Sequence, residues 1–528
     1  MTRKRLFILF VMFAIMANLL MLRLFIIITD GEYAKAAAEQ GSYTAEVSRI
    51  RPNFKDCNGI SFTGHGMSYK AFVIPSKTDC DSLKSHIPKA DLEYFEKCLS
   101  NGRPFLIDLK NERDSLTVPE VILCRQRYEE NTVASHLLGY LDYDGHGISG
   151  LERVFEDYLL KNTIRETVSV PVNARGIALG GAQSVRRQTE GGSGDITLTV
   201  DIEMQKTAEK IAGQLMKSGA VVVTDLQTSA IKAMVSLPDF DQNDIASAIA
   251  ADNTALMNKA LEAYNVGSVY KIVIAAAALE ASDGNFERTC TGSIDIGGVT
   301  YTCNDFAAHG DMTLEKALEH SCNTYFIALG NEIGAEAIHN MALSMGLGKS
   351  AELCAGYSTK TGNIPSLTEL DRSSELCNNC FGQGALLTTP IHIAQYTACV
   401  ANDGVFTPFS IVKSVGEQKI EKIPSSKPMS TKTAQFIKNS LALAVEKGTG
   451  TKAKPQFVSA AGKTGTAQTG SYNEDGSEKL VGWFTGYFPA ENPRYQITVM
   501  TVNEGYGYMS AAPIFARLAD AIWLGFCS

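Results

Sequence analysis

The amino terminus carries a long apolar run preceded by basic residues. Residues 6–22 are apolar except for Asn18, and residues 24–28 continue the run after Arg23. About 20 helical residues cross a bilayer core, so this pattern predicts a membrane-spanning helix whose Arg23 side chain reaches toward the interface. The run is too long for a cleaved signal peptide and lacks a clear small-residue cleavage site. We therefore expect a retained anchor over residues 1–29.

The charges that flank this run predict its orientation. Arg3, Lys4 and Arg5 precede it, and basic residues favour the cytoplasmic side of a membrane. We expect a cytoplasmic amino terminus, with everything after Thr29 outside the cell. Because no later stretch approaches spanning length, the pattern predicts a single-pass protein.

The next region has a mixed pattern. Up to about residue 175 it contains short amphipathic segments, such as residues 89–100 and 150–160, and no set of convergent catalytic residues. Residues 176–194 are rich in Gly, Ser and Gln with few apolar positions, which predicts a linker or domain boundary.

Beyond residue 194, strand and helix periodicities follow one another. Residues 272–279 are wholly apolar, and a helix that is apolar on all sides is normally buried in a large domain. Strands, then many helices, then strands and a helix predict an α+β fold with helices around an antiparallel sheet. The predicted strands cover residues 195–201, 219–225, 230–236, 480–488 and 495–502, and the main predicted helices cover residues 203–217, 268–280 and 511–524.

Length and composition narrow the class of protein. The chain has 528 residues, 45% of them apolar and 20% charged, which suits roughly three domains with sizeable cores. Its 48 Lys and Arg against 57 Asp and Glu give a net charge of -9. Without a basic surplus to neutralise phosphates, nucleic-acid binding as the main function is excluded. The composition also excludes a disordered chain and a small disulfide scaffold.

The chain has twelve cysteines, and an exterior location permits disulfides. Cys290 and Cys303 flank an apparent hairpin over residues 292–302, which can bring them opposite one another. Cys377 and Cys380 have the spacing of half a zinc site, but no second such pair accompanies them. We expect no metal, and the pairing of the cysteines stays open.

Ser268 and Lys271 open the apolar helix. Residues three apart share a helix face, so the lysine amine can reach the serine hydroxyl, and the helix amino terminus favours a developing alkoxide. Apolar surroundings lower the pKa of a lysine, so that a neutral fraction can accept the serine proton. The same spacing at Ser410 and Lys413 has no apolar helix behind it, and we interpret that pair as a chance match.

Two further motifs carry suitable chemistry. Ser321 and Asn323 lie between helical stretches at residues 314–319 and 324–329, where a loop can present a hydroxyl and an amide to a cleft. The Lys-Thr-Gly-Thr motif at residues 463–466 precedes the last two strands. A lysine, two hydroxyls and a glycine suit a strand edge that holds an extended substrate with a carboxylate.

Each of these motifs has a second copy elsewhere in the chain. Residues 360–362 repeat Lys-Thr-Gly without a following strand, and residues 471–473 repeat Ser-x-Asn within a turn-like region. We expect both copies to be solvated loops.

Ser-x-x-Lys, Ser-x-Asn and Lys-Thr-Gly in this order are typical of class A β-lactamases and penicillin-binding proteins. Longer segments resemble the transpeptidase domain of class B penicillin-binding proteins: LTVDIEMQKTAE, GAVVVTDLQTSAIKAMVSLPDFD, NKALEAYNVGSVYK, GQGALLTTPIHIAQYTACVANDG and AGKTGTAQ. Upstream, GHGISGLERVFEDYL resembles a motif of that family's amino-terminal pedestal domain. The resemblance covers nearly everything from Arg49 to the end. It implies a pedestal (dimerisation-like) domain over residues 30–190 and a penicillin-binding/serine β-lactamase-like transpeptidase domain over residues 191–528.

The resemblance also implies roles for the residues at matching positions. Ser268 would attack the carbonyl of a penultimate D-alanine and become acylated. Lys271 would accept the serine proton, and Ser321 would relay a proton to the departing D-alanine. Asn323 would bind a substrate amide.

The third motif would complete the site. Lys463 would sustain its electrostatics, and Thr464 and Thr466 would hold the terminal carboxylate beside Gly465. The backbone N–H groups of Ser268 and Thr466 would form the oxyanion hole, a contribution of about 3–4 kcal/mol per donor.

The activity implied by the resemblance is a serine-type peptidoglycan D,D-transpeptidase of the bacterial cell membrane, inhibited covalently by β-lactams. It would cross-link stem peptides ending in D-Ala-D-Ala, with release of D-alanine and without a cofactor. No glycosyltransferase domain fits within the length of the pedestal, so glycan polymerisation would fall to a partner in a wall-synthesis complex.

The sequence departs from the family pattern at three places. Residues 266–271 read Val-Gly-Ser-Val-Tyr-Lys where the family usually has Pro-Gly-Ser-Thr-Phe-Lys, and residues 258–260 read Asn-Lys-Ala for Asn-Arg-Ala. We expect these changes to affect packing and to leave the reacting atoms in place. Residues 49–59 form a weak version of a pedestal motif, which puts the contacts of the pedestal in doubt.

Three alternatives stay open from the residues alone. A D,D-carboxypeptidase or a β-lactamase-like hydrolase needs a deacylating water, and the sequence places no general base for it. A non-catalytic subunit of a wall-synthesis complex would have a degenerate site, whereas all the motif residues are present. A β-lactam sensor would need a cytoplasmic signalling segment, and only residues 1–5 precede the apolar run.

Overall fold

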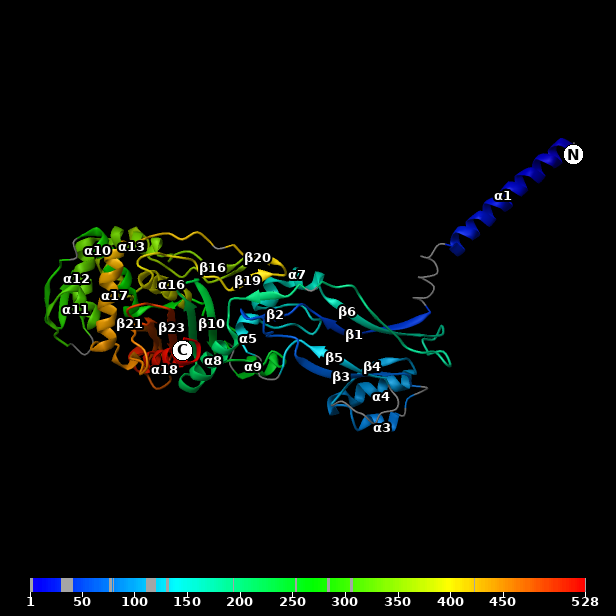
Figure 1. Ribbon diagram of the computed structural model, residues 1–528, viewed down its shortest axis with the longest axis horizontal. Helices are drawn as coiled ribbons and strands as arrows, with labels where there is room; N and C mark the ends of the chain where they lie inside the picture. Colours follow the sequence, from blue (N-terminus) through cyan, green and yellow to red (C-terminus); the bar gives the residue numbers. More distant parts are fainter. Residues whose placement is uncertain are drawn as a thin grey trace. The chain divides into compact units, whose positions relative to one another are not determined.

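The computed structural model describes residues 3–29, 41–75, 78, 80–110, 120–129, 133–192, 194–251, 254–282, 285–303, 307–421 and 423–527. The chain forms two compact units, each built from three stretches (Figure 1). Unit 1 contains Met1–Arg51, Gly64–Glu129 and Lys161–Gly192, and unit 2 contains Pro52–Thr63, Glu130–Leu160 and Ser193–Ser528. The predicted domains at residues 30–190 and 191–528 stay a prediction, since the units alternate along the chain.

Unit 1 begins with the apolar helix α1 (Arg3–Thr29). None of its residues is buried against the rest of the chain. Within the described residues it is the one helix long and apolar enough to cross a membrane. The predicted amino-terminal helix is confirmed, and it fits a single-pass membrane anchor.

The rest of unit 1 consists of two antiparallel sheets and short helices. One sheet has the order β1-β6-β7 and the other β4-β3-β5. Val47, Phe72 and Val168 lie in a buried cluster shared by the two sheets, and Phe95 packs on the second sheet. The elements are β1 (Ser42–Ile50), β3 (Gly66–Val73), α3 (Cys80–Lys84), η1 (Lys89–Asp91), α4 (Leu92–Asn101), β4 (Phe105–Leu109), β5 (Glu120–Gln126), β6 (Ile164–Pro171) and β7 (Val185–Gln188).

Strand β7 lies within residues 176–194, which the sequence predicts as a linker. All four of its residues are exposed, so the strand has no apolar alternation that a sequence pattern can show. It forms by antiparallel pairing with β6. The linker prediction is therefore wrong for these four residues.

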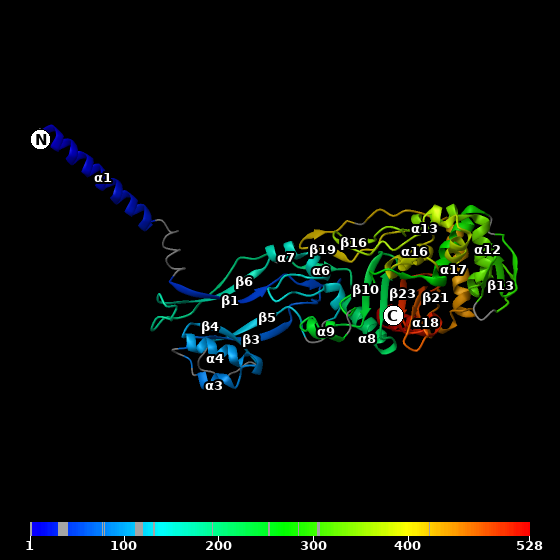
Figure 2. The same cartoon turned by 180° about the vertical axis from the view of Figure 1, so that it is seen from behind.

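Unit 2 contains an antiparallel five-stranded sheet with the order β10-β9-β23-β22-β21. The helices α10, α11, α12, α13 and α17 gather in one group (Figures 1 and 2). The strands and the 3-10 helices of unit 2 are β2 (Phe54–Lys55), β8 (Ile196–Leu198), β9 (Gly219–Asp225), β10 (Ala230–Leu237), β11 (Tyr264–Asn265), η2 (Gly267–Tyr270), β12 (Arg288–Cys290), β13 (Ser293–Ile296), β14 (Val299–Thr302), β15 (Gly310–Met312), β16 (Glu352–Cys354), β17 (Tyr357–Ser358), β18 (Leu387–Thr388), β19 (Val412–Val415), β20 (Gln418–Lys419), η4 (Thr451–Ala453), β21 (Ala461–Tyr472), β22 (Glu478–Phe488) and β23 (Tyr495–Val502).

Some helices of unit 2 pack on the two faces of this sheet, and others lie elsewhere in the unit. The helices of the unit are α5 (Ser135–Leu138), α6 (Gly150–Val154), α7 (Glu156–Lys161), α8 (Ile202–Leu215), α9 (Ile245–Ala251), α10 (Lys271–Ala281), α11 (Leu314–Glu319), α12 (Asn323–Ile333), α13 (Ala335–Ser344), α14 (Leu367–Leu370), α15 (Ser373–Cys380), α16 (Pro390–Ala401), α17 (Thr431–Glu446) and α18 (Gly507–Phe526). Helix α7 ends one residue into unit 1.

Alternation along the strands divides the core of unit 2 into two layers. In β9, Val221 and Val223 face a cluster with α8 and α18, whereas Ala220 and Val222 face the cluster that contains α10 and α16. Because successive side chains of a strand point to opposite faces, a strand buried on both sides has a continuous apolar sequence. The predicted α+β fold with an antiparallel sheet between helices is confirmed.

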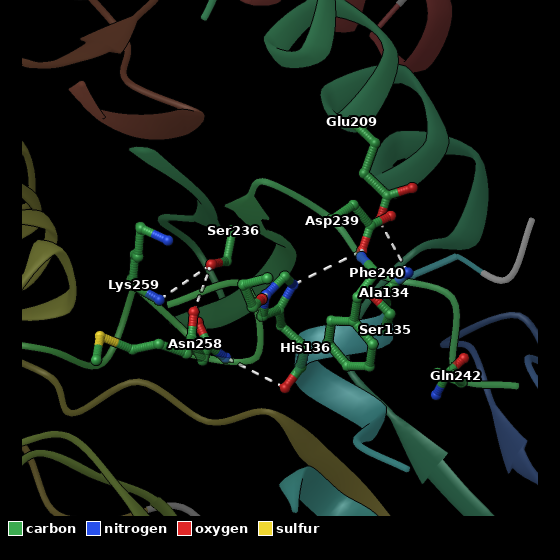
Figure 3. Close-up of polar contacts among 12 residues, drawn as sticks. Ala134, Ser135, His136, Glu209, Ser236, Asp239, Phe240, Gln242, Asn258 and Lys259 are labelled. Atoms are coloured by element: carbon green, nitrogen blue, oxygen red, sulfur yellow. Dashed lines mark hydrogen bonds and ion pairs between the residues drawn. The ribbon is translucent and has the colours of Figure 1, made fainter. Parts of the chain in front are cut away.

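A polar cluster fastens α5 to the rest of unit 2 (Figure 3). The backbone N–H of Ala134 donates to Glu209 Oε1 at 2.8 Å, and the Ser135 hydroxyl donates to the Asp239 carboxylate. His136 Nε2 lies 2.7 Å from the carbonyl oxygen of Ala255, which can only accept, so this nitrogen carries the proton. Residues 134–136 precede the predicted catalytic domain in the sequence. These bonds attach them to α8 and to the chain after β10.

Glu209 gives this cluster a predicted pH dependence. Burial raises the pKa of Glu209 from 4.5 to about 7, although bonds from Gln205 and Ala134 oppose the shift. In the unfolded chain the carboxyl ionises near 4.5, so stability falls as the pH rises from about 4.5 to about 7. We expect Glu209→Gln, which keeps an oxygen acceptor, to raise the free energy of unfolding at pH 8 by roughly 2 kcal/mol and to change little at pH 5.

Thermal and urea unfolding of the full chain in detergent at the two pH values measure this difference. Glu203→Gln on the same helix is the matched control, because that carboxylate is exposed and pairs with Lys206. The nearby charge of Asp239 also raises the pKa of Glu209, so it acts in the same direction as burial. Equal destabilisation by Glu209→Gln at pH 5 and pH 8 would contradict the prediction.

Candidate active site

The predicted nucleophile lies at the junction of a short 3-10 helix and the buried helix. Ser268 belongs to η2, and α10 begins at Lys271, so the helix predicted from residue 268 starts with a tighter turn. Ser268 is half-buried, whereas the other residues of this turn, and Lys271 itself, are buried. The turn therefore leaves the serine as its accessible residue.

Two glycines hold this turn in place. The N–H of Gly267 donates to the carbonyl oxygen of Gly382 at 2.8 Å. A Cβ atom on Gly267, whose φ is +67°, would lie 2.5 Å from the carbonyl oxygen of Thr466 on β21. Glycine is required here both for the left-handed conformation and for the close approach. The turn thus lies directly against β21, with Ser268 next in the chain after Gly267, beside Thr466.

We expect Gly267→Ala to lower both stability and acylation. The new methyl group meets backbone atoms that cannot move without shifting β21, and the positive φ adds strain of about 1–2 kcal/mol. We expect a total loss of about 3 kcal/mol in unfolding free energy and at least a tenfold slower reaction with penicillin. Gly476→Ala is the matched control, because Gly476 has a φ of +81° and open space around it. If both variants behaved alike, close packing against Thr466 would not be the reason for the glycine.

The second motif surrounds the lysine amine. Lys271 Nζ donates to the carbonyl oxygen of Ser321 at 2.7 Å, to Ser321 Oγ at 3.2 Å and to Asn323 Oδ1 at 2.6 Å. Ser321 has a φ of +55° and precedes α12. The ring of Phe326 from α12 lies 5.5 Å from Nζ. The structure therefore brings three of the predicted site residues into one hydrogen-bonded group.

Ser268 and Lys271 are one turn apart, but their side chains share no hydrogen bond in the described part of the chain. The amine hydrogens of Lys271 point to the turn that contains Ser321 and Asn323 instead. Catalytic hydrogen bonds often form only when substrate is bound, so this geometry is compatible with Lys271 acting as the base for Ser268.

Burial controls the charge of the two lysines. It lowers the pKa of Lys271 from 10.5 to about 8, and the nearby thiols of Cys322 and Cys303 oppose the shift. Burial also lowers the pKa of Lys463 well below its usual range, and the charge of Lys271 adds to this effect. The predicted desolvation of Lys271 is therefore observed, and a substantial fraction of this amine is neutral near pH 8.

The third motif lies on the edge strand of the large sheet. In β21, Lys463 pairs with Thr485 and Thr466 with Gly482, all on the side of β22. Lys463 is fully buried and its Nζ donates to the carbonyl oxygen of Thr464 at 3.2 Å. The predicted position of this motif at a strand edge is confirmed.

Three contacts to this strand were not predicted from the sequence. Thr449 Oγ1 accepts a hydrogen bond from Thr464 Oγ1 at 3.0 Å, and the side-chain amide of Gln383 donates to the carbonyl oxygen of Thr466 at 3.4 Å. The N–H of Gly507 at the start of α18 donates to Thr466 Oγ1 at 3.1 Å. Gln383 lies in a segment that carries the family resemblance, whereas no motif marks Thr449.

The duplicate motifs differ from the site motifs in local structure. Lys413 is in β19 and exposed, so it does not share a helix face with Ser410, and residues 360–362 form a loop. Ser471 and Tyr472 belong to the end of β21, so the loop prediction is wrong for these two residues, although both are exposed as expected.

The cysteines with described side chains are free thiols. The predicted hairpin between Cys290 and Cys303 is confirmed as β13 and β14, and the two sulfurs lie 3.7 Å apart. Cys377 and Cys380 are buried in α15.

A serine at the start of a buried helix, a lysine held by a Ser-x-Asn turn and a Lys-Thr-Gly edge strand define a serine acyl-transfer domain of the penicillin-binding type. The family model described as "Penicillin binding protein transpeptidase domain" matches residues 219–520. The chain belongs to the penicillin-binding protein transpeptidase family.

Relatives with assigned names agree with this family. The chain is 32% identical over 446 residues to penicillin-binding protein PbpB of Mycolicibacterium smegmatis, covering 77% of this chain and 66% of that protein. It is 28% identical over 419 residues to peptidoglycan D,D-transpeptidase MrdA of Haemophilus influenzae, covering 71% and 62%. The match therefore spans slightly less than two thirds of the length of both relatives.

Solved structures establish the fold. Penicillin-binding protein 3 of Mycobacterium tuberculosis, solved with aztreonam, aligns with a TM-score of 0.65 and 24% identity over 91% of this chain and 97% of that one. A penicillin-binding protein 2 from Helicobacter pylori, solved with MreC, aligns with a TM-score of 0.70 and 20% identity over 92% and 99%.

Proposed function

We propose that the chain is a membrane-anchored peptidoglycan D,D-transpeptidase. The observation that carries the proposal is the hydrogen-bonded group formed by Lys271, Ser321 and Asn323, with the half-buried Ser268 one turn before Lys271 in the chain. It supplies a nucleophile, a partly neutral base and a hydroxyl that can pass on a proton. The name of the relative MrdA supports the same reaction.

In the first step, Ser268 Oγ attacks the carbonyl carbon of the penultimate D-alanine while neutral Lys271 takes the hydroxyl proton. The N–H groups of Ser268 and Thr466 stabilise the oxyanion. The peptide C–N bond then breaks, and Ser321 passes a proton from Lys271 to the amine of the departing D-alanine. This leaves an ester on Ser268.

In the second step, the amine of a neighbouring stem peptide attacks the ester. Lys271, or Ser321 acting with it, accepts a proton from that amine and returns one to Ser268 Oγ as the acyl–oxygen bond breaks. The product is a new amide cross-link. Thr464 and Thr466 on β21 hold the carboxylate of the donor peptide, with the buried Lys463 behind them.

Product analysis tests transfer against hydrolysis. The full chain in detergent is incubated with a pentapeptide donor and an excess of an acceptor amine, and the products are resolved by mass spectrometry. We expect the cross-linked dimer to exceed the hydrolysed tetrapeptide, and a penicilloyl adduct to persist for hours. Predominant hydrolysis with rapid clearance of the adduct would instead identify a carboxypeptidase or a β-lactamase-like enzyme.

The pKa of Lys271 predicts the pH dependence of acylation. The reactive amine is the neutral form, which grows as the pH rises through about 8. We expect the second-order rate of acylation by penicillin to rise about tenfold per pH unit below pH 8 and to level off above it. Timed labelling between pH 6 and pH 9 measures the profile, and thermal unfolding at each pH shows that the chain stays folded. A rate that is flat or falls over this range would contradict the role of Lys271.

We also propose the orientation and partner of the protein. The three basic residues at the start of α1 support a cytoplasmic amino terminus, which places the acyl-transfer domain outside the bacterial cell membrane. The predicted pedestal over residues 30–190 is too short for a glycosyltransferase domain, which supports a separate partner that supplies the glycan strands. The H. pylori protein solved with MreC shows that a protein of this fold is found in a complex with another protein.

A further inference from the structure

Four potential metal ligands meet next to the Ser-x-Asn turn. Cys290 ends β12, Cys303 follows β14, His309 precedes β15, and Cys322 precedes α12. Their ligand atoms all lie within 4.8 Å of one another. The three cysteines are buried and the histidine is half-buried. Three sulfurs and one imidazole nitrogen form a common ligand set of structural zinc sites.

Three of the six distances between ligand atoms in this cluster match the edges of a tetrahedron around zinc, and all six are within 4.8 Å. Bond lengths of about 2.3 Å to sulfur and about 2.0–2.1 Å to nitrogen place two sulfurs about 3.8 Å apart and a sulfur and a nitrogen about 3.6 Å apart. Cys303 Sγ lies 3.7 Å from both Cys290 Sγ and Cys322 Sγ. Cys290 Sγ lies 3.4 Å from His309 Nδ1. Each of these three edges lies within about 0.2 Å of the value for zinc.

Disulfide bonding explains the cluster less well. A disulfide brings two sulfurs to about 2.05 Å, whereas Cys303 is equidistant from two thiols at nearly twice that separation. Any single disulfide would also leave a third buried thiol beside it and give the histidine no role. A metal site uses all four groups.

The Thr324 hydroxyl lies against two of these sulfurs. Thr324 Oγ1 donates to Cys290 Sγ at 3.1 Å and lies 3.4 Å from Cys322 Sγ. Outer hydrogen bonds of this kind orient the ligands of a metal and tune its binding.

We propose that Cys290, Cys303, His309 and Cys322 bind one structural zinc ion. Three thiol protons leave to solvent when the ion binds, so the site carries a net charge of -1. Because all four positions of the tetrahedron are filled by protein, the ion has no open position for chemistry. The expectation of no metal was based on Cys377 and Cys380 alone. These two residues lie in α15 and do not belong to this cluster.

The position of Cys322 gives this ion a function. Cys322 lies between Ser321 and Asn323, which hold the amine of Lys271. A zinc bond to Cys322 would fasten this turn to the segments that carry Cys290 and Cys303. The ion would therefore be a positioning element for the acylation site, a consequence that depends on the proposed function, whereas zinc binding itself does not.

Metal analysis of the full chain tests the site directly. The chain is expressed with zinc in the medium, purified in detergent, and measured by mass spectrometry of its metals and by X-ray absorption. We expect about one zinc ion per chain, with three sulfur neighbours and one nitrogen neighbour. Cys303→Ser and His309→Gln should each lower the zinc content or affinity at least tenfold. Cys399→Ser is the matched control, because it removes a buried thiol from α16.

The outcomes are distinct. His309→Gln changes a half-buried residue, so it keeps the test valid if Cys303→Ser fails to fold. Wild-type chain without zinc after zinc-supplemented expression, a mass 2 Da lower from an oxidised pair of these cysteines, or full zinc content in both variants would each overturn the proposal. We further expect chelation to slow acylation by fluorescent penicillin and added zinc to restore it. Zinc binding without this effect would refute only the positioning function.

Discussion

Replacing Ser268 with alanine is expected to abolish covalent labelling of the chain by a fluorescent penicillin. The acyl bond forms to Ser268 Oγ, and alanine removes this atom while keeping the turn between Gly267 and Tyr270. Ser268 is half-buried and its hydroxyl forms no hydrogen bond with the described residues, so we expect the unfolding temperature to stay within a few degrees. The expected loss is therefore specific to the reaction.

Gel fluorescence after timed labelling, followed by peptide mapping of the adduct, measures this result. Ser410→Ala is the matched control, because Ser410 belongs to the duplicate Ser-x-x-Lys spacing on an extended segment. It should label as fast as the wild-type chain. Persistent labelling of Ser268→Ala would show that another residue is the nucleophile and would reject the assignment.

Replacing Lys271 with methionine is expected to slow acylation by about 10²–10⁴-fold, the usual contribution of a general base. Methionine has a similar length and fills the same buried space. It also removes the amine that donates to Ser321 and Asn323. Acceptors left unpaired in this way lower the free energy of unfolding by about 1–3 kcal/mol. Because the amine is desolvated, its removal offsets part of that cost. The chain should therefore fold and still bind penicillin reversibly.

Timed labelling at several penicillin concentrations separates the acylation rate from binding. The remaining reaction of Lys271→Met should lose the rise through pH 8, since the titrating amine is gone. Lys438→Met is the matched control, because Lys438 is nearly buried in the same unit and pairs with Asp403 instead. A wild-type pH profile in Lys271→Met would show that another group titrates.

Much of unit 2 could be predicted from the sequence because its core strands are apolar on both faces. The predicted strands over residues 219–225 and 495–502 coincide with β9 and β23. The four residues of β7 could not be predicted, because a fully exposed strand is defined only by its partner. The start of the helix at Ser268 was also misplaced, since the 3-10 turn depends on the contact of Gly267 with β21.

In the candidate site too, some residues can be predicted from local sequence, whereas others come together only through the fold. Ser268, Lys271, Ser321 and Lys463 belong to short motifs that local spacing reveals. Thr449 meets Thr464 only because η4 and β21 fold against the same helices, and no spacing in the sequence indicates that contact. The four ligands of the proposed zinc site are spread over residues 290–322, at intervals that match no short metal-binding pattern, and a hairpin brings them together.

The alternation of the two units along the chain has a consequence for how the protein is made. Phe54 of β2 is fully buried in the core of unit 2, and β2 pairs with β8 in parallel. During synthesis, this early segment would emerge well before its partner strand β8. It must remain unfolded or protected at least until β8 (Ile196–Leu198) has been made. An expression fragment that begins near residue 191 would lack Phe54 and would leave a hole in its own interior.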